Sequence, residues 1–199
     1  MEQEQLAPGI WSYTGIIEKP MEFISDLEGL VEINNLQWFD ASANDGDVAE
    51  TEIRKSVRDC LAISIPAYDR EPDARANGGP LPLLHDFLNA SLNPVLNLYE
   101  SEHAAWHWKD SEGWQILKYG KGQHFVNHYD DSKQFPRTVS MSYYLNDDYE
   151  GGEIEFPRFG LKIKPKADQA IFFPSNYVYN HIVHPVTSGT RYAVVGWWN

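Results

Sequence analysis

Two residues with metal-binding side chains, His128 and Asp130, lie in the second half of the chain with one residue between them. In an extended strand, residues two apart point to the same side, so this imidazole and carboxylate would lie next to each other. A second histidine would complete a site with two histidines and one carboxylate, which leaves metal positions open and suits non-haem Fe(II) and O₂ chemistry. The segment 181–185 (HIVHP) offers His181 and His184, and strand alternation alone does not choose between them.

The surroundings of this H-x-D pair narrow the interpretation, because a lone H-x-D is common by chance. The pair ends a run of the form Y-x-x-G-Q-x-aromatic-x-x-H-x-D, made by Tyr119, Gly122, Gln123, Phe125, His128 and Asp130. Further along come Tyr143-Tyr144-Leu145-Asn146, Glu150-Gly151-Gly152-Glu153, Phe156-Pro157, His181, Pro185-Val186, Gly189 and Arg191. In order and spacing, residues 114–198 resemble the prolyl 4-hydroxylase-like branch of the Fe(II)/2-oxoglutarate dioxygenases.

The resemblance implies a role for each of these residues. His128, Asp130 and His181 would bind the iron; the family pattern selects His181 through its distance to the Pro-Val pair and to Arg191. Arg191 would hold the distal carboxylate of 2-oxoglutarate with help from the hydroxyl of Tyr144. Tyr119 would line the pocket near the metal, and Arg54 would lie near a substrate groove.

Arg191 also stands out without the resemblance. It opens the strongly apolar segment 192–198 (YAVVGWW), which predicts a buried strand. A buried guanidinium needs an anionic partner, and its planar fork matches a carboxylate. His103 and His107 lie four residues apart on a predicted helix, but they lack the glutamate of a zinc H-E-x-x-H motif. We interpret them as helix surface or packing.

Composition limits the possible partners. The chain has 199 residues, 42% of them hydrophobic, and a net charge of −13. Such acidity argues against nucleic-acid binding, which depends on lysine and arginine. No apolar run is long enough for a membrane span. The single cysteine, Cys60, excludes a disulfide within the chain, and the acidic first residues lack the apolar segment of a signal peptide. We therefore expect a cytoplasmic or otherwise intracellular protein.

Hydrophobic periodicity predicts a mostly β protein with flanking helices. We expect a first strand over 9–17, a helix over 20–33, a loop over 40–51, strands within 54–65, a second loop over 66–80, and two helices over 81–90 and 93–108. Eight strands follow, over 114–119, 123–130, 137–145, 153–156, 161–164, 169–173, 178–184 and 191–198. The resemblance implies a double-stranded β-helix, or jelly roll, with the N-terminal helices packed on one sheet. We expect one domain over 1–199, with 1–113 flanking a metal-binding core at 114–199.

The functional hypothesis is an Fe(II)- and 2-oxoglutarate-dependent dioxygenase that also uses O₂, with ascorbate as reductant. Its expected substrate is a proline in a peptide or protein. One alternative is the same chemistry on a free amino acid or another side chain. Another is a non-catalytic jelly-roll binding module. The intact set of proposed ligands, together with Arg191, argues against it. The long acidic segment 40–51 is further predicted to be a lid over a bound peptide.

Overall fold

The computed structural model describes the whole chain except residues 34, 42–53, 69–74, 76–78 and 103–106. Within the described part, eight strands form the larger sheet in the order β1-β2-β12-β8-β15-β6-β5-β3. Their bounds are β1 (Glu2–Ala7), β2 (Ile10–Thr14), β12 (Gln169–Pro174), β8 (Val139–Tyr144), β15 (Arg191–Trp198), β6 (Ser111–Tyr119), β5 (Leu61–Ile65) and β3 (Phe39–Asp40).

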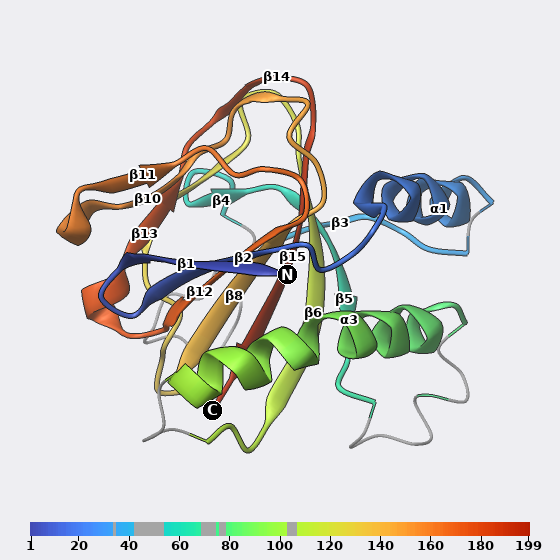
Figure 1. The fold of residues 1–199 in the computed structure, drawn as a ribbon. Helices are drawn as coiled ribbons and strands as arrows, with labels where there is room; N and C mark the ends of the chain where they lie inside the picture. The colour runs from blue at the N-terminus through green and yellow to red at the C-terminus, as the bar shows by residue number, and fades with distance from the viewer. Residues whose placement is uncertain (34, 42–53, 69–74, 76–78, 103–106) are drawn as a thin grey trace.

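A smaller sheet carries part of the sequence motif. Its described strands, in the order β11-β10-β13-β7-β4, are β11 (Leu161–Ile163), β10 (Ile154–Phe156), β13 (His181–Val183), β7 (His124–His128) and β4 (Arg58–Asp59). A short pair, β9 (Glu150–Gly151) and β14 (Val186–Ser188), forms the turn region at the top of Figure 1. The short 3-10 helices η1 (Pro157–Phe159) and η2 (Tyr177–Tyr179) connect strands. The mostly β prediction is confirmed, although β1, β3, β9 and β14 were not foreseen.

Strand alternation gives the larger sheet two different buried faces. All six residues of β8 are buried. On one face Val139, Met141 and Tyr143 join the large core cluster, while on the other Tyr144 joins a separate cluster with residues of the smaller sheet. In a central strand that is covered on both faces, the side chains of successive residues are all buried. The second face is where the two sheets meet.

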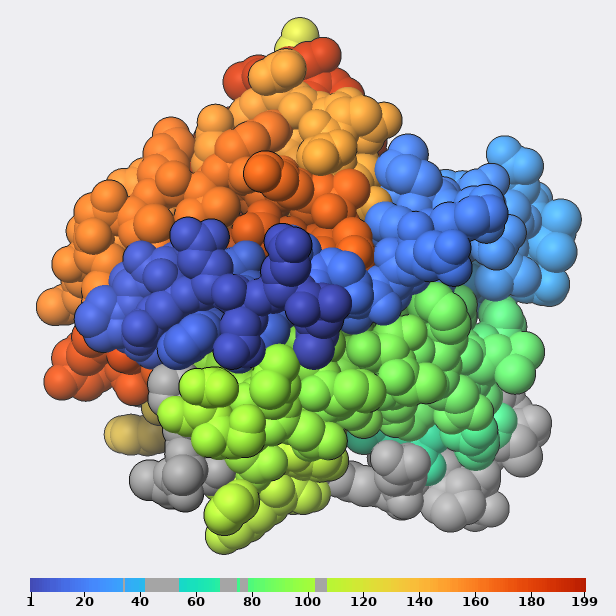
Figure 2. Space-filling view, in the orientation of Figure 1, coloured from blue at the N-terminus to red at the C-terminus, as the bar shows by residue number. Residues whose placement is uncertain are grey.

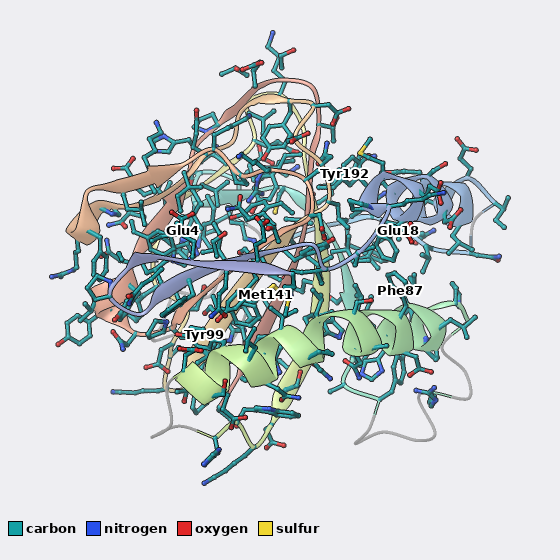
Figure 3. The ribbon with its side chains drawn as sticks, viewed as in Figure 1. Glu4, Glu18, Phe87, Tyr99, Met141 and Tyr192 are labelled. Carbon is teal, nitrogen blue, oxygen red and sulfur yellow. The ribbon has the colours of Figure 1, made fainter. Side chains whose placement is uncertain are left out.

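The helices α1 (Pro20–Glu32) and α3 (Leu81–Glu102) cover the first face, as predicted (Figure 1). Figure 3 shows Phe87 and Tyr99 on α3 and Met141 on the sheet beside it. Phe87 stacks on Phe23 of α1 with ring centroids 5.3 Å apart, and Tyr99 stacks on Phe172 of the sheet at 5.2 Å. Together with β1, the two helices cover much of the surface seen in Figure 2.

The prediction of two helices over 81–90 and 93–108 is wrong, because α3 runs without a break through Pro94. An internal proline costs roughly 3 kcal/mol. The buried stripe of Leu88, Leu92, Leu96 and Tyr99 continues past it, however, and its burial offsets that cost. The described part of the helix reaches Glu102, and the predicted continuation over 103–106 lies outside the described residues. None of the described helices is long and apolar enough to cross a bilayer.

The predicted first strand is observed as the shorter β2, and its partner β1 was missed because its residues are polar. β1 is the edge strand, and Glu2 to Gln5 are exposed. The predicted lid over 40–51 lies outside the described residues, apart from Asp40 in β3 and Ala41. His103 also lies outside them, and His107 follows the helix and contacts Glu100.

Candidate metal and cosubstrate site

Two neighbouring strands of the smaller sheet bring His128, Asp130 and His181 together. His128 ends β7 and His181 begins β13, and the two residues are direct partners in the antiparallel pairing of these strands. The Nε2 atom of His128 lies 3.5 Å from Oδ1 of Asp130, and the Nε2 atom of His181 lies 4.0 Å from Oδ2. One ligand atom from each residue lies within 4.8 Å of the others, so one metal ion could contact all three.

Main-chain carbonyls fix the orientation of both imidazoles. Nδ1 of His128 lies 2.8 Å from the carbonyl oxygen of Val126, and Nδ1 of His181 lies 3.2 Å from that of Tyr179. A carbonyl can only accept, so each Nδ1 carries the proton and each Nε2 presents its lone pair. This is the tautomer that a metal ligand requires.

Asp130 lies beyond the end of its strand, contrary to the prediction of a strand over 123–130. Its position depends on other contacts: its backbone N–H donates to the carbonyl of Ser175 at 3.0 Å, and Oδ2 accepts from the Ser140 hydroxyl at 2.6 Å. Burial by itself raises the pKa of Asp130, but His181 and His128 outweigh it, so the pKa lies well below its ordinary value. The group is therefore an anionic ligand.

His181 is buried and His184 is not a member of the cluster. Burial and the neighbouring His128 lower the pKa of His181 to about 4, against the attraction of Asp130, so the ring is neutral at pH 7. His184 instead directs Nε2 to the carboxylate of Glu155 at 2.6 Å. Of the two candidates left open by the sequence, only His181 lies with His128 and Asp130.

Arg191 lines the same pocket and is 2% exposed. Its guanidinium carbon lies 4.8 Å from the Tyr119 ring centroid and 5.0 Å from that of Tyr144. Among the described residues, its Nε and Nη1 atoms have no hydrogen-bond partner, and neither has the hydroxyl of Tyr144. Burial disfavours the charged form of Arg191, but the surrounding tyrosines raise its pKa, and it remains cationic. Buried donors without acceptors fit an anionic ligand that would supply them.

The backbone of the Gly151-Gly152 turn lies close to the Arg191 side chain. Gly152 has a φ of +64°, and a Cβ atom built on it would lie 3.0 Å from Cδ of Arg191. Only glycine adopts this conformation readily and allows such an approach. The Gly151-Gly152 step is thus a close backbone contact beside the buried arginine.

Tyr119 is also among the residues that line the pocket. It is the strand partner of Arg191 and is 1% exposed. Burial, with Cys60 nearby, raises the pKa of its phenol, which stays neutral.

The structure does not place Arg54 in the pocket; it places Arg58 there instead. The pocket is lined by Arg58, Tyr119, Phe125, His128, Asp130, His181, Arg191 and Trp197, among others. Arg58 is 8% exposed, and its guanidinium carbon lies 5.1 Å from the Phe125 ring, which itself stacks on His128. One signal for Arg58 is present in the sequence: it is a charged residue shortly before the mostly apolar segment 60–65. The role of Arg54 stays a prediction.

Comparison with known proteins agrees with this geometry. Residues 114–199 match the family model of the 2OG-Fe(II) oxygenase superfamily. Over these residues the chain is similar to that superfamily. The matched residues hold the three clustered ligands together with Tyr119, Tyr144 and Arg191. The matched family implies Fe(II), 2-oxoglutarate and O₂ as cofactor and cosubstrates.

Relatives of the chain include a PKHD-type hydroxylase of Synechococcus, 39% identical over 82 residues. That match covers 39% of this chain and 35% of the relative. Over the whole fold, the chain resembles a Trichoplax adhaerens prolyl hydroxylase solved with a peptide fragment of hypoxia inducible factor. The TM-score is 0.73 at 18% identity, covering 96% of this chain and 83% of that one. A Pseudomonas putida prolyl-4-hydroxylase gives a TM-score of 0.61 at 19% identity, covering 96% and 92%. These structures confirm the predicted jelly-roll fold with flanking helices.

The residues present fit the groups that the superfamily uses. Two imidazoles and one carboxylate are the ligand set of a non-haem Fe(II) site with open positions. Both imidazoles are in the required tautomer, and Arg191 with Tyr144 offers unpaired donors to a carboxylate.

Proposed function

We propose that the protein is an Fe(II)- and 2-oxoglutarate-dependent dioxygenase that hydroxylates a C–H bond of a proline in a peptide or protein. The observation that carries the proposal is one buried pocket with two unlike sites. Three metal-ligand atoms converge in its lining, and Arg191, whose Nε and Nη1 have no partner among the described residues, lines it too. A bidentate 2-oxo acid that also ends in a carboxylate matches both sites at once.

The residues of the chain would divide the work as follows. His128, Asp130 and His181 would hold Fe(II) through Nε2, a carboxylate oxygen and Nε2. Arg191 and Tyr144 would orient the distal carboxylate of 2-oxoglutarate by charge-assisted hydrogen bonds. The buried rings of Tyr119 and Trp197 would exclude water from the space between, which protects the reaction from side products.

Bound Fe(II) would supply the activation of O₂, for which protein side chains have no equivalent. The overall reaction balances as 2-oxoglutarate, O₂ and R–H giving succinate, CO₂ and R–OH. One oxygen atom enters succinate and the other enters the product alcohol. Ascorbate is proposed as the reductant that returns iron to Fe(II) when it is oxidised without product formation.

The proline assignment rests on the solved relatives, two of which are named as prolyl hydroxylases. The test is incubation of the protein with Fe(II), 2-oxoglutarate, ascorbate and a panel of proline-containing peptides. Succinate and a peptide mass gain of one oxygen should appear together in equal amounts, and neither should appear with His181→Ala.

Matched peptides with alanine in place of proline, and free proline, separate the alternatives. Oxygen incorporated into free proline or into another side chain would replace the prolyl-peptide assignment but keep the reaction class. A protein that binds Fe(II) yet forms no succinate with any of these substrates would overturn the enzymatic proposal.

A further inference from the structure

Arg137 contacts two residues of the pocket lining, Asp130 and Trp197, and joins three elements. Its Nε and Nη2 donate to the two carboxylate oxygens of Glu112, each at 2.6 Å. Its Nη1 donates to the main-chain carbonyl of Asp130 at 3.2 Å. The guanidinium carbon also lies 4.1 Å from the Trp197 ring. Only an arginine side chain can donate two parallel hydrogen bonds to one carboxylate and still offer an N–H group to another acceptor.

The two ends of this arrangement belong to different sheets. Glu112 lies on β6 of the larger sheet, and Asp130 follows β7 of the smaller one. Asp130 lies beyond its strand; its N–H and that of Asp131 both donate to the Ser175 carbonyl at 3.0 Å, and its own carbonyl accepts from Arg137. Arg137 makes a second contact with the segment after β7: its backbone N–H donates to Oδ1 of Asp131 at 3.1 Å.

We propose that Glu112 and Arg137 are positioning residues that set the location of Asp130 for metal binding. Glu112 holds the guanidinium, and the guanidinium holds the Asp130 carbonyl, so a residue outside the pocket acts on the metal site. The inference rests on the proposed function, because it takes His128, Asp130 and His181 as the metal ligands.

Ordinary surface ion pairs contribute little, but this pair differs from them. Its geometry is bidentate and the Arg137 side chain is only 15% exposed, with an aromatic ring against it. Both properties make the position of the guanidinium well defined. Partners outside the ligand set that orient a ligand commonly change metal affinity by about 10- to 100-fold when they are removed.

The test compares Fe(II) binding by three proteins in the absence of oxygen, 2-oxoglutarate and peptide. These are the wild type, Glu112→Gln, and the control Asp86→Asn. Asp86 accepts from Nη1 and Nη2 of Arg75, so it also belongs to a bidentate pair, on α3 and outside the pocket lining. Binding is measured by titration, and the rate of metal release is measured with a chelator in excess.

Glu112→Gln should bind Fe(II) about tenfold more weakly than the wild type and release it faster. Asp86→Asn should match the wild type in both measurements. Arg137→Lys keeps the charge but loses the fork, and should fall at or below Glu112→Gln. The melting temperatures of the metal-free Glu112→Gln and Asp86→Asn proteins should agree, which separates positioning from loss of fold.

Equal affinity and release rate in the wild type and Glu112→Gln would overturn the positioning role while leaving the proposed function intact. Weaker binding by Glu112→Gln together with no succinate from the wild type would support the positioning role and count against the dioxygenase. A wild type that fails to bind a divalent metal would overturn both.

Discussion

The Ser140 hydroxyl donates to Oδ2 of Asp130 at 2.6 Å, from the face of β8 that looks toward the smaller sheet. Ser140 also lies 2.8 Å from the Ser175 hydroxyl, and both serines are buried. One carboxylate oxygen is therefore engaged by the protein, which leaves Oδ1 as the oxygen available to a metal ion. The arrangement favours binding through a single oxygen.

Ser140→Ala should weaken Fe(II) binding by about tenfold, because the carboxylate loses the group that orients it. Ser140→Thr keeps a hydroxyl and should recover part of the loss. Ser64→Ala, an exposed position on β5 of the same sheet, serves as control. Anaerobic titration with Fe(II) measures all three, and an affinity of Ser140→Ala equal to that of the control would contradict the orienting role.

The choice of His181 over His184 gives a second prediction. His128→Ala, Asp130→Ala and His181→Ala should each lose metal and turnover, because each removes a ligand atom from the cluster. His184→Ala should keep its metal, because it loses only the contact with Glu155. The metal content of the purified proteins decides; loss of metal from His184→Ala with retention by His181→Ala would reverse the assignment.

The buried Arg191 gives a third prediction. Arg191→Ala should raise the KM for 2-oxoglutarate tenfold or more, about 1.4 kcal/mol, because a charge-assisted pair is lost. Tyr144→Phe should cost roughly 1 kcal/mol, the value of one hydrogen bond. Direct titration of 2-oxoglutarate should show the same order, and Arg158→Ala, at an exposed arginine, should leave it unchanged. Unchanged affinity in both pocket variants would move the cosubstrate elsewhere.

The site residues that could be predicted from the sequence are those whose spacing reflects strand geometry. His128, Tyr119, Tyr144 and Arg191 lie within or at the ends of predicted strands, where alternation decides which side chains face the pocket. The position of Asp130 depends instead on Ser140, Ser175 and Arg137, which are distant in sequence or lie in irregular segments. Such contacts leave no periodic pattern.

The same reasoning explains the errors in the fold. Pro94 indicated a helix boundary because local propensity penalises proline, but the packing of Leu88, Leu92 and Leu96 against the sheet outweighed it. β1 carries no apolar alternation, since it adds to an edge and exposes most of its side chains. Arg58 was not singled out from the sequence, because its place in the pocket depends on the pairing of β4 with β7, in which its partner Phe125 lies far along the chain.

A final prediction concerns Glu28, which fastens α1 to the larger sheet. Its Oε1 accepts from Lys118 and from the Tyr192 hydroxyl, each at 2.7 Å (Tyr192 is labelled in Figure 3). Burial opposes ionisation, but these hydrogen bonds outweigh it and lower the pKa of Glu28 below its ordinary 4.5. The unfolded chain therefore binds more protons in this range, so the stabilisation is complete above pH 4.5 and is lost as the pH falls through the folded-state pKa.

Glu28→Gln should lower the free energy of unfolding by about 1 kcal/mol at pH 7, and the difference from wild type should shrink in acid. Urea unfolding at pH 7 and at successively lower pH measures this, with Glu22→Gln, at an exposed position of α1, as control. A difference that stays constant as the pH falls would show that the Glu28 carboxylate does not fasten the helix by its charge.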